Sequence, residues 1–434
     1  MPGGSDPAGA GQRRILFLQG PLAPLYKMMG AEVRKAGHEV FRINLCAGDW
    51  LHWHGTGCVS YRGSVGRWPA YIEAFLKEKA ITDLVLHGDQ RIYHRAAIEA
   101  AKPLGIQIAV TELGYLRPGW MTLERNGLST LSHFPAEPDE IRAISQAAGE
   151  IDFSPRFPGS QWLQIVPDVI YNLTNVFFSS FYPHYQRHTI YHPVPEYVRG
   201  AIRMAGENKR NGAADVALQE LVSEGTPYFV LPLQLEGDFQ LRRHSPYKSF
   251  ADVIELVFAS FANSAPAATH LVLKSHPLDV GYENWPDVIG EAKARHGLKG
   301  RVHFLDGGNL AAVFKQTRGV VTLNSTAGVE ALQAGVPVKT LVPAHYGISG
   351  LTHSGDLESF WTTPEAPDAA LLDNYLRALA VTIQVRGSIH NTEGLPVAAR
   401  NMAGRILTRQ LNEPGAFVDP PPRLEAARTL GVPL

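Results

Sequence analysis

A polar corner interrupts an apolar stretch in the last third of the chain. The segment GVVTLNSTAGVEALQAGVPV, residues 319–338, begins as a β-branched run, changes to Asn-Ser-Thr, and resumes as a short helical pattern ending in glycine. A helix N-terminus presents unpaired N–H groups and a partial positive charge. The corner is therefore suited to an anion, and a nucleotide phosphate is the obvious candidate.

Four residues of this corner are candidate ligands or supports. Ser325 and Thr326 could bond a phosphate, Gly328 could let a ligand approach the backbone, and Glu330, one turn into the helix, could hold ribose hydroxyls. The alternative is that Ser-Thr only caps a surface helix. The segment is not a P-loop, because Gly-Lys-Ser/Thr is absent. The corner alone leaves both interpretations open.

Two earlier strands in the same half also end in chemically useful residues. LVLKSHPLD places Lys274 and His276 after a strand, where a cation and an imidazole could stabilise a departing phosphate; a loop histidine bonded to backbone is the alternative. A second strand ends in PLQLEGDFQLRRHSPY, which supplies Gln234, Glu236, Asp238, Arg242 and Arg243. A carboxylate beside guanidinium groups could act as nucleophile or base on an anionic substrate, or these charges could lie on a solvated turn.

The first half offers a matching set of polar strand ends. VTELGYLRPGWMTLE puts Glu112 at a strand end with Arg117 shortly after, and HGDQRIYH supplies Asp89, Arg91 and His94. One carboxylate from each half facing a shared cleft is an arrangement that glycosyl transfer or hydrolysis can use. None of these short motifs is specific by itself.

Strands that alternate with helices would position these residues. Gly20 lies in a Gly-Pro turn between a strand and a helix closed by Gly37. The expected strands are 14–19, 38–45, 81–89, 106–115, 226–238, 268–277, 300–306, 319–323 and 337–342, and the clearest helices are 22–37, 94–105, 368–384 and 397–411. Strands that open into polar residues at their carboxyl ends predict doubly wound parallel sheets.

The pattern divides the chain into five parts. We expect a Rossmann-like domain at 13–150, a helical connection at 151–225 and a second Rossmann-like domain at 226–365. Helices at 366–412 precede a proline-rich tail at 413–434 that we expect to be loosely ordered. The predicted fold class is α/β, with two parallel sheets facing a cleft.

Composition limits the function classes. A chain of 434 residues exceeds one usual core, and its net charge of -1 provides no global field for nucleic acid. The only cysteines, Cys46 and Cys58, fit a reducing cytoplasm. The N-terminal MPGGSDPAGAGQRR lacks a signal-peptide core, and no stretch approaches the roughly 20 apolar residues of a spanning helix. GxGxxG and HExxH are absent, so neither a dinucleotide nor a metal is demanded.

Taken in order, several segments resemble the bacterial capsule polysaccharide biosynthesis family of the KpsS/LipB type. The likeness spans about residues 14–350, and the segments are FLQGPLAPLYKMMGAEVRKAGHEVFRINLCAGDW, LVLHGDQRIYHRAAIEAAKPLGI, TELGYLRPGWMTLERNGLSTLS, LPLQLEGDFQLRRHSPY, KSHP and NSTAGVEALQAGVPV. The resemblance implies a retaining β-Kdo glycosyltransferase of GT-B-like fold, with an acceptor-side domain at 13–150 and a nucleotide-sugar domain at 226–365. It also implies that the enzyme uses CMP-Kdo, needs no metal cofactor, and places Kdo on a phosphatidylglycerol-type lipid at the inner face of the cytoplasmic membrane.

The resemblance also implies residue roles. Asp238 would be the nucleophile or electrostatic partner at the anomeric carbon, Glu112 the acid/base towards the acceptor hydroxyl, and His276 the group facing the CMP phosphate. Ser325, Thr326 and Glu330 would then hold the nucleotide. One departure is that the family often has two acids where this chain reads Glu112-Leu113-Gly114, so a role for a second acid does not transfer.

Three questions stay open at the level of sequence. The chain could instead be a GT-B-like transferase or epimerase using another nucleotide sugar, or a non-catalytic capsule-assembly protein that binds sugar or lipid. The protein could also make peripheral contact with the cytoplasmic membrane and with capsule-assembly proteins. The aromatic residues of the middle segment could be core or could rest on an anionic membrane near several arginines; these residues are Trp162, Tyr171, Phe177, Phe178, Phe181, Tyr182, Arg156, Arg187, Arg199 and Arg203.

Overall fold

The computed structural model describes residues 11–434. Most of the N-terminal segment MPGGSDPAGAGQRR, for which no signal peptide is expected, lies outside that range. Contacts divide the chain into two compact units that are each discontinuous in sequence. The first unit contains residues up to Leu128, Glu150–His188 and Leu379–Phe417; the second contains Ser129–Gly149, Thr189–Ala378 and Val418–Leu434. Residues 151–225, expected as one helical connection, are thus shared between the two units.

The first unit is built on a seven-stranded sheet. Its order is β12-β6-β5-β4-β1-β2-β3, and β3, β2, β1, β4 and β5 run parallel, whereas β6 and β12 are antiparallel to their neighbours. The bounds are β1 (Arg14–Phe17), β2 (Glu39–Asn44), β3 (Cys58–Ser60), β4 (Asp83–His87), β5 (Gln107–Leu113), β6 (Trp120–Arg125) and β12 (Gln384–Arg386).

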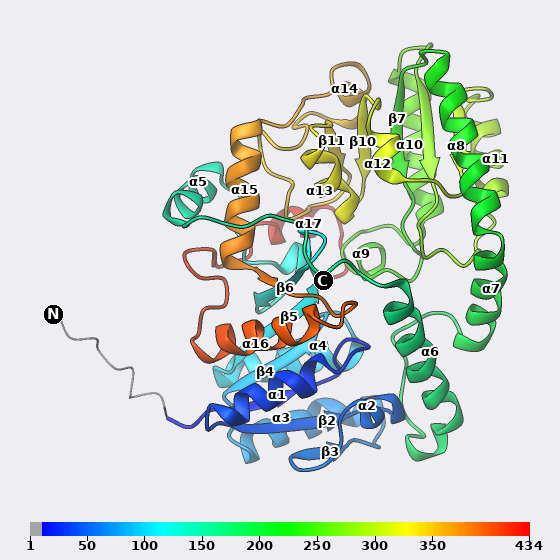
Figure 1. Ribbon diagram of the computed structural model, residues 1–434. Coiled ribbons are helices and arrows are strands. Elements are labelled where there is room, and N and C mark those ends of the chain that lie inside the picture. The colour runs from blue at the N-terminus through cyan, green and yellow to red at the C-terminus, as the bar shows by residue number, and fades with distance from the viewer. Residues whose placement is uncertain (1–10) are drawn as a thin grey trace. The chain divides into compact units, whose positions relative to one another are not determined.

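Helices cover both faces of this sheet because its central strands are apolar on both sides. Ile15 and Phe17 pack towards α1 (Leu25–Lys35) and α16 (Gly394–Leu407), and Leu16 packs towards α3 (Trp68–Glu78) and α4 (Ile92–Ala101) (Figure 1). The other helical segments of the unit are α2 (Ala47–His52), η1 (Val65–Arg67), η2 (Lys102–Leu104), α6 (Gln161–Phe177) and η4 (Ser179–Phe181).

The second unit contains a five-stranded, fully parallel sheet. Its order is β11-β10-β7-β8-β9, formed by β7 (Tyr228–Pro232), β8 (His270–Lys274), β9 (Val302–Leu305), β10 (Gly319–Thr322) and β11 (Val338–Thr340). Its helical segments are η3 (Ser129–Leu131), α5 (Pro138–Ala147), α7 (Pro193–Ala205), α8 (Glu207–Ser223), α9 (Phe239–Arg242), α10 (Phe250–Ser264), α11 (Trp285–Arg295), α12 (Leu310–Phe314), α13 (Thr326–Gln333), α14 (Leu357–Thr362) and α17 (Leu424–Thr429).

Side chains from both faces of β7 show how this second sheet is covered. Phe229 and Leu231 join the core formed with α10, α11 and α14, while the Tyr228 hydroxyl donates to the Val313 carbonyl of α12 on the other face at 2.8 Å. The chain adds β8 and β9 on one side of β7 and then β10 and β11 on the other, so the strand order reverses between β7 and β10. A fully parallel sheet, and a mixed sheet with five parallel strands, confirm the predicted α/β class, whereas two parallel sheets were expected.

Two details differ from the sequence-based expectation. The helix expected at 368–384 is α15 (Ala369–Thr382), and Gln384 already belongs to β12, which pairs with β6. The tail at 413–434 was expected to be loosely ordered, and that is wrong because α17 is anchored by a buried arginine. Arg423 donates to four carbonyls at 2.6–3.0 Å, those of Phe134, Pro135, Ala344 and His345.

The Arg423 anchor yields a stability prediction. Arg423→Met should lower the free energy of unfolding by about 3 kcal/mol, since it leaves buried carbonyls without donors. Arg428→Met is the matched control on the same helix, because Arg428 is exposed and its ion pair with the exposed Glu425 is long, at 3.8 Å. Its effect should stay below about 0.5 kcal/mol. Urea unfolding measures both, and equal effects would contradict an anchored tail.

Candidate functional sites

Three buried polar side chains lie where the strand order of the second sheet reverses. Thr322 ends β10, and Gln234 and Asn324 each follow their strand by two residues. They are 0%, 4% and 7% exposed, and the Thr322 hydroxyl and both amide groups have no hydrogen-bond partner among residues 11–434. An unpaired buried group costs about 1–3 kcal/mol. A polar ligand at this edge would recover that cost, and this is where open α/β sheets bind ligands.

The predicted corner lies directly after Asn324. Ser325 caps α13, accepting from the Ala327 N–H at 3.2 Å, and Thr326 is the first residue of the helix. Gly328 faces Tyr346, whose hydroxyl would lie 2.4 Å from an added Cβ, so packing rather than ligand approach explains the glycine. Glu330 is on the exposed side of α13. The helix N-terminus therefore adjoins the unpaired amides.

The carboxylates after β7 have different environments. Asp238 caps α9 and accepts from the Gln240 N–H at 2.9 Å, while Glu236 accepts from the Phe250 N–H at 2.8 Å. Burial raises the pKa of Glu236, and Glu283 and Asp252 raise it further. Arg242 lies 5.8 Å from the Phe239 ring, and Arg243 is the residue that ends α9.

A hollow of about 80 Å³ in the second unit brings three predicted residues together. Gln234, Glu236 and His276 line it, and the His276 Nδ1 accepts from the Leu278 N–H at 3.1 Å. Lys274, two residues before His276, is buried at the end of β8 and donates to the Ser275 carbonyl at 3.3 Å. Burial lowers the pKa of Lys274. The hollow is not lined by Lys274 or by the α13 corner.

The same hollow includes residues that the sequence patterns did not single out. Tyr191 stacks on Tyr282 with ring centroids 4.0 Å apart, and its hydroxyl donates to Glu283 at 3.1 Å. Tyr191 comes from the middle segment and Tyr282 from the loop after β8, so no local spacing connects them. Only the fold places these aromatic and acidic groups beside Gln234.

In the first unit, Glu112 and His87 form a close pair at the ends of β5 and β4. The His87 Nε2 lies 3.6 Å from a Glu112 carboxylate oxygen, and 39% of the Glu112 side chain is exposed. Burial lowers the pKa of His87 well below its usual value, and Arg91 lowers it further. Desolvation raises the pKa of Glu112, opposed by the Leu113 N–H and by Arg91. A carboxyl with a raised pKa beside a neutral imidazole is suited to acid/base work.

The other predicted residues of the first unit have mainly structural contacts. Asp89 is buried and accepts from the Leu128 N–H at 2.9 Å, and burial raises its pKa to about 6. Gly20 leaves room for the Tyr26 ring, which would lie 2.9 Å from an added Cβ. Arg117 is exposed and donates to the Gly114 carbonyl at 3.1 Å. These residues and the Glu112 pair follow neighbouring strands of one sheet.

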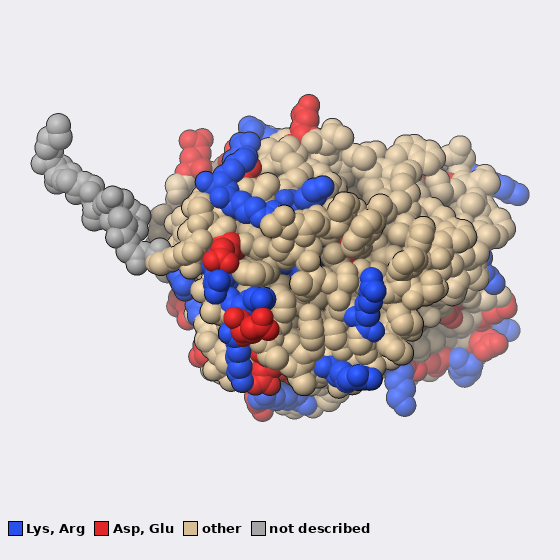
Figure 2. Space-filling view, turned by 90° about the horizontal axis from the view of Figure 1, so that it is seen from below, with Lys and Arg blue, Asp and Glu red and all other residues tan. Residues whose placement is uncertain are grey.

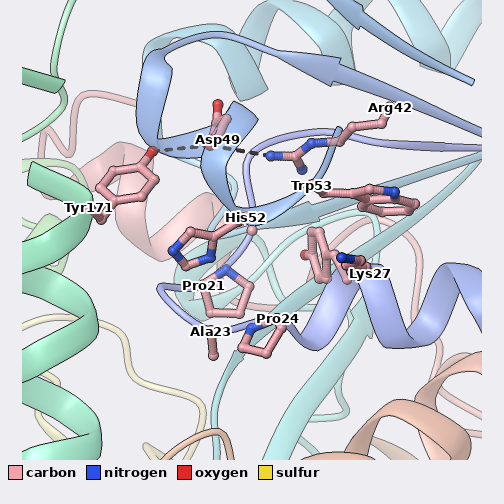
Figure 3. A pocket seen from close by; sticks show the side chains of 11 residues that line it. Pro21, Ala23, Pro24, Lys27, Arg42, Asp49, His52, Trp53 and Tyr171 are labelled. Atoms are coloured by element: carbon pink, nitrogen blue, oxygen red, sulfur yellow. Dashed lines mark hydrogen bonds and ion pairs between the residues drawn. The ribbon is translucent and has the colours of Figure 1, made fainter. Parts of the chain in front are cut away.

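A second pocket, shown in Figure 3, is filled by a buried polar network that sequence reasoning did not find. Arg42 pairs with Asp49 at 3.2 Å, and the Tyr171 hydroxyl donates to Asp49 at 3.0 Å. Gln19 donates to the Tyr171 hydroxyl at 2.6 Å. The remaining space of about 10 Å³ holds no more than a water molecule. The network therefore fastens α6 to α2 and the sheet rather than leaving room for a sugar.

The described residues contain neither a candidate metal site nor a candidate membrane-spanning helix. No group of three or more His, Cys, Asp or Glu side chains within residues 11–434 is arranged to hold a metal ion. In that same range, no helix has the length and apolar character needed to cross a membrane.

A family model and two curated relatives of this chain all concern capsule polysaccharides. A family model described as capsule polysaccharide biosynthesis protein matches residues 82–390. The chain is 27% identical over 389 residues to the capsule polysaccharide export protein KpsS of Escherichia coli, covering 86% of this chain and 96% of that protein. It is 28% identical over 402 residues to the capsule polysaccharide modification protein LipB of Neisseria meningitidis serogroup A, covering 88% and 93%. A solved β-Kdo 2,7 transferase, KpsC of Thermosulfurimonas dismutans, gives a TM-score of 0.45 at 14% identity, covering 92% of this chain and 99% of that one.

The raised pKa of Asp89 predicts a pH dependence. Its folded-state pKa of about 6 lies above the usual value of 3.8, so the folded state binds this proton more tightly than the unfolded chain does. Stability is then lost as pH rises from about 4 to about 7, and Asp89→Asn should avoid that loss while still accepting from Leu128. In urea unfolding, the difference in free energy of unfolding between the variant and the wild type should shift by about 3 kcal/mol in favour of the variant as pH rises across this range. A pH-independent difference would contradict the assignment.

Proposed function

The chain belongs to the capsule polysaccharide biosynthesis family, and on that premise we propose that it is a Kdo glycosyltransferase. It transfers Kdo from CMP-Kdo to a phosphatidylglycerol or lysophosphatidylglycerol type of lipid in capsule synthesis, at the cytoplasmic face of the membrane. The observation that carries the proposal is the set of unpaired buried groups Gln234, Thr322 and Asn324 at the reversal point of the second sheet. The names of KpsS and LipB support the pathway.

The second unit is the proposed donor site. The amides of Gln234 and Asn324 would pair with polar groups of the donor, and the α13 N-terminus at Ser325 and Thr326 would receive the phosphate of CMP. Glu330 would contact the ribose, with Lys274 and His276 supporting the departing phosphate. One of Arg242 and Arg243 would meet the carboxylate that Kdo bears at its anomeric carbon.

The proposed reaction retains configuration through two displacements. The Asp238 carboxylate forms a bond to the anomeric carbon as the bond from that carbon to the phosphate oxygen breaks, and CMP leaves with the electron pair. The acceptor hydroxyl, losing its proton to Glu112, then displaces Asp238. The carboxylate also stabilises the oxocarbenium-like transition state of each step. As written, the reaction needs only the donor and the acceptor.

Two other functions fit parts of these observations. A transferase or epimerase using another nucleotide sugar would use the same strand-end groups with a different base and sugar. A non-catalytic capsule-assembly protein would bind sugar or lipid and release no nucleotide. A transferase or epimerase for another nucleotide sugar would not bind CMP as the proposed enzyme does. A non-catalytic binding protein would not release CMP from CMP-Kdo.

The unpaired amides give the most specific binding prediction. Gln234→Leu and Asn324→Leu should each weaken CMP binding at least tenfold in calorimetry, about 1.4 kcal/mol. Each should also raise the free energy of unfolding by about 1 kcal/mol, because an unsatisfied polar group is removed.

A matched control is Gln384, a buried glutamine whose amide is fully used. It accepts from the Tyr115 N–H at 2.9 Å and donates to the Thr122 hydroxyl at 2.9 Å. Gln384→Leu should therefore destabilise the protein by about 2 kcal/mol without changing CMP affinity. If all three leucine variants destabilise alike, Gln234 and Asn324 are structural and the donor site lies elsewhere.

The catalytic roles are tested by CMP release from CMP-Kdo with phosphatidylglycerol as acceptor. Asp238→Ala should reduce the rate at least a thousandfold, since it removes the nucleophile, and Glu112→Ala about a hundredfold. Arg142→Ala, at an exposed residue of α5 that pairs with the exposed Asp139, is the control and should keep the wild-type rate. Release unaffected by either acidic substitution would refute the roles, and no release by the wild type would favour the binding protein.

A further inference from the structure

Helix α6 of the first unit has its polar and apolar sides reversed. The residues that face the protein are polar: Tyr171 bonds to Asp49, and the Asn175 amide oxygen accepts from the Gly48 N–H at 2.7 Å. These two are also the only residues of α6 that are buried. A helix packed on a soluble core normally buries its apolar side.

The opposite side of α6 is an exposed apolar stripe. Trp162, Val166, Ile170 and Phe177 recur at the spacing of one helix face, and the first and last are 66% and 75% exposed. Exposed aromatic residues continue the stripe past the end of α6 into η4; they are Phe178 and Phe181, whose ring centroids lie 6.1 Å apart. We call these six residues the α6 face. A contiguous apolar patch of this kind marks an interaction surface.

The segments that form the α6 face or adjoin it contain few acids. Residues 161–188, and residues 45–67 with the helix α2 that packs against α6, contain two acids, Asp49 and Asp168. Asp49 is buried against Arg42, and Asp168 is two residues from both Val166 and Ile170, which places it across the helix from the stripe. Arg62 and Arg67 are exposed, and the Arg62 guanidinium lies 5.8 Å from the Tyr182 ring beside η4.

Figure 2, seen from below, shows a broad central area that is largely uncharged and carries isolated Lys and Arg, with Asp and Glu towards the edges of the view. An apolar stripe bordered by arginines matches a bilayer that contains anionic lipid, where aromatic rings enter the boundary between headgroups and acyl chains and arginines meet phosphates. A second copy of this chain fits less well, because a two-fold contact would bring the same arginines together.

We propose that the α6 face is a membrane-docking surface that holds the first unit on an anionic lipid bilayer. The face itself follows from exposure and charge, whereas the choice of lipid over protein as partner rests on the proposed lipid acceptor. Docking would hold the enzyme at the surface where its acceptor is found.

The test uses the full chain and sedimentation with vesicles of equal parts phosphatidylglycerol and phosphatidylcholine, without donor. Binding should fall at least tenfold in the variant Trp162→Ser, Phe177→Ser, Phe181→Ser. The control variant Leu104→Ser, Val216→Ser, Leu430→Ser removes exposed apolar residues elsewhere and should bind within twofold of wild type. Arg62→Gln with Arg67→Gln should weaken binding to these vesicles, reduce its salt dependence, and leave binding to phosphatidylcholine alone unchanged.

Two results would overturn the proposal. One is wild-type vesicle binding by the correctly folded α6-face variant, with folding checked by an unchanged unfolding midpoint. The other is a dimer of the wild type that the same variant abolishes, which would assign the face to a second copy. Transfer to a short-chain phosphatidylglycerol dissolved below its micelle concentration should survive in the α6-face variant. If wild type binds vesicles but transfers nothing, the proposed function fails while the docking surface stands.

Discussion

The structure depends on the rule that parallel strands buried on both faces must place their carboxyl ends at one edge of the sheet. Each strand is apolar while it runs through the core and becomes polar where it leaves the core. The polar residues that follow neighbouring strands therefore lie together at that edge of the sheet. In the second unit, this edge collects Gln234 after β7, Lys274 at the end of β8 and Asn324 after β10. The same rule places Glu112 and His87 together at the carboxyl ends of β5 and β4 in the first unit.

This rule explains which parts of the structure the sequence predicts. The strands and strand-end residues are visible because β-branched runs and polar ends are local patterns. Strands β3, β6 and β12 were not predicted. For β12 the reason is that its pairing depends on distant residues, since Gln384 of β12 donates to Thr122 of β6. The order of the tail was missed for the same reason, because Arg423 is satisfied by carbonyls nearly 300 and about 80 residues away.

The α6 segment shows a different limit of sequence reasoning. Aromatic residues at helical spacing usually mark a core, and nothing in QWLQIVPDVIYNLTNVF distinguishes Trp162 from Tyr171. The distinction arises from Asp49, which is buried with Arg42 and needs further donors. Tyr171 supplies one through its hydroxyl, so the helix turns its polar side inward and its apolar side outward. A buried charge on α2 therefore decides which face of α6 is left for a partner.

The missing second acid of the first unit has a related explanation. The family often has two adjacent acids where this chain has Glu112 and Leu113, and two carboxylates would raise each other's pKa by repulsion. Here desolvation raises the pKa of Glu112 without a second charge. His87 does not counteract this, because burial and Arg91 keep its own pKa low and the ring neutral. A single carboxyl can thus hold its proton at higher pH than a solvated one, which is the property that an acid/base group requires.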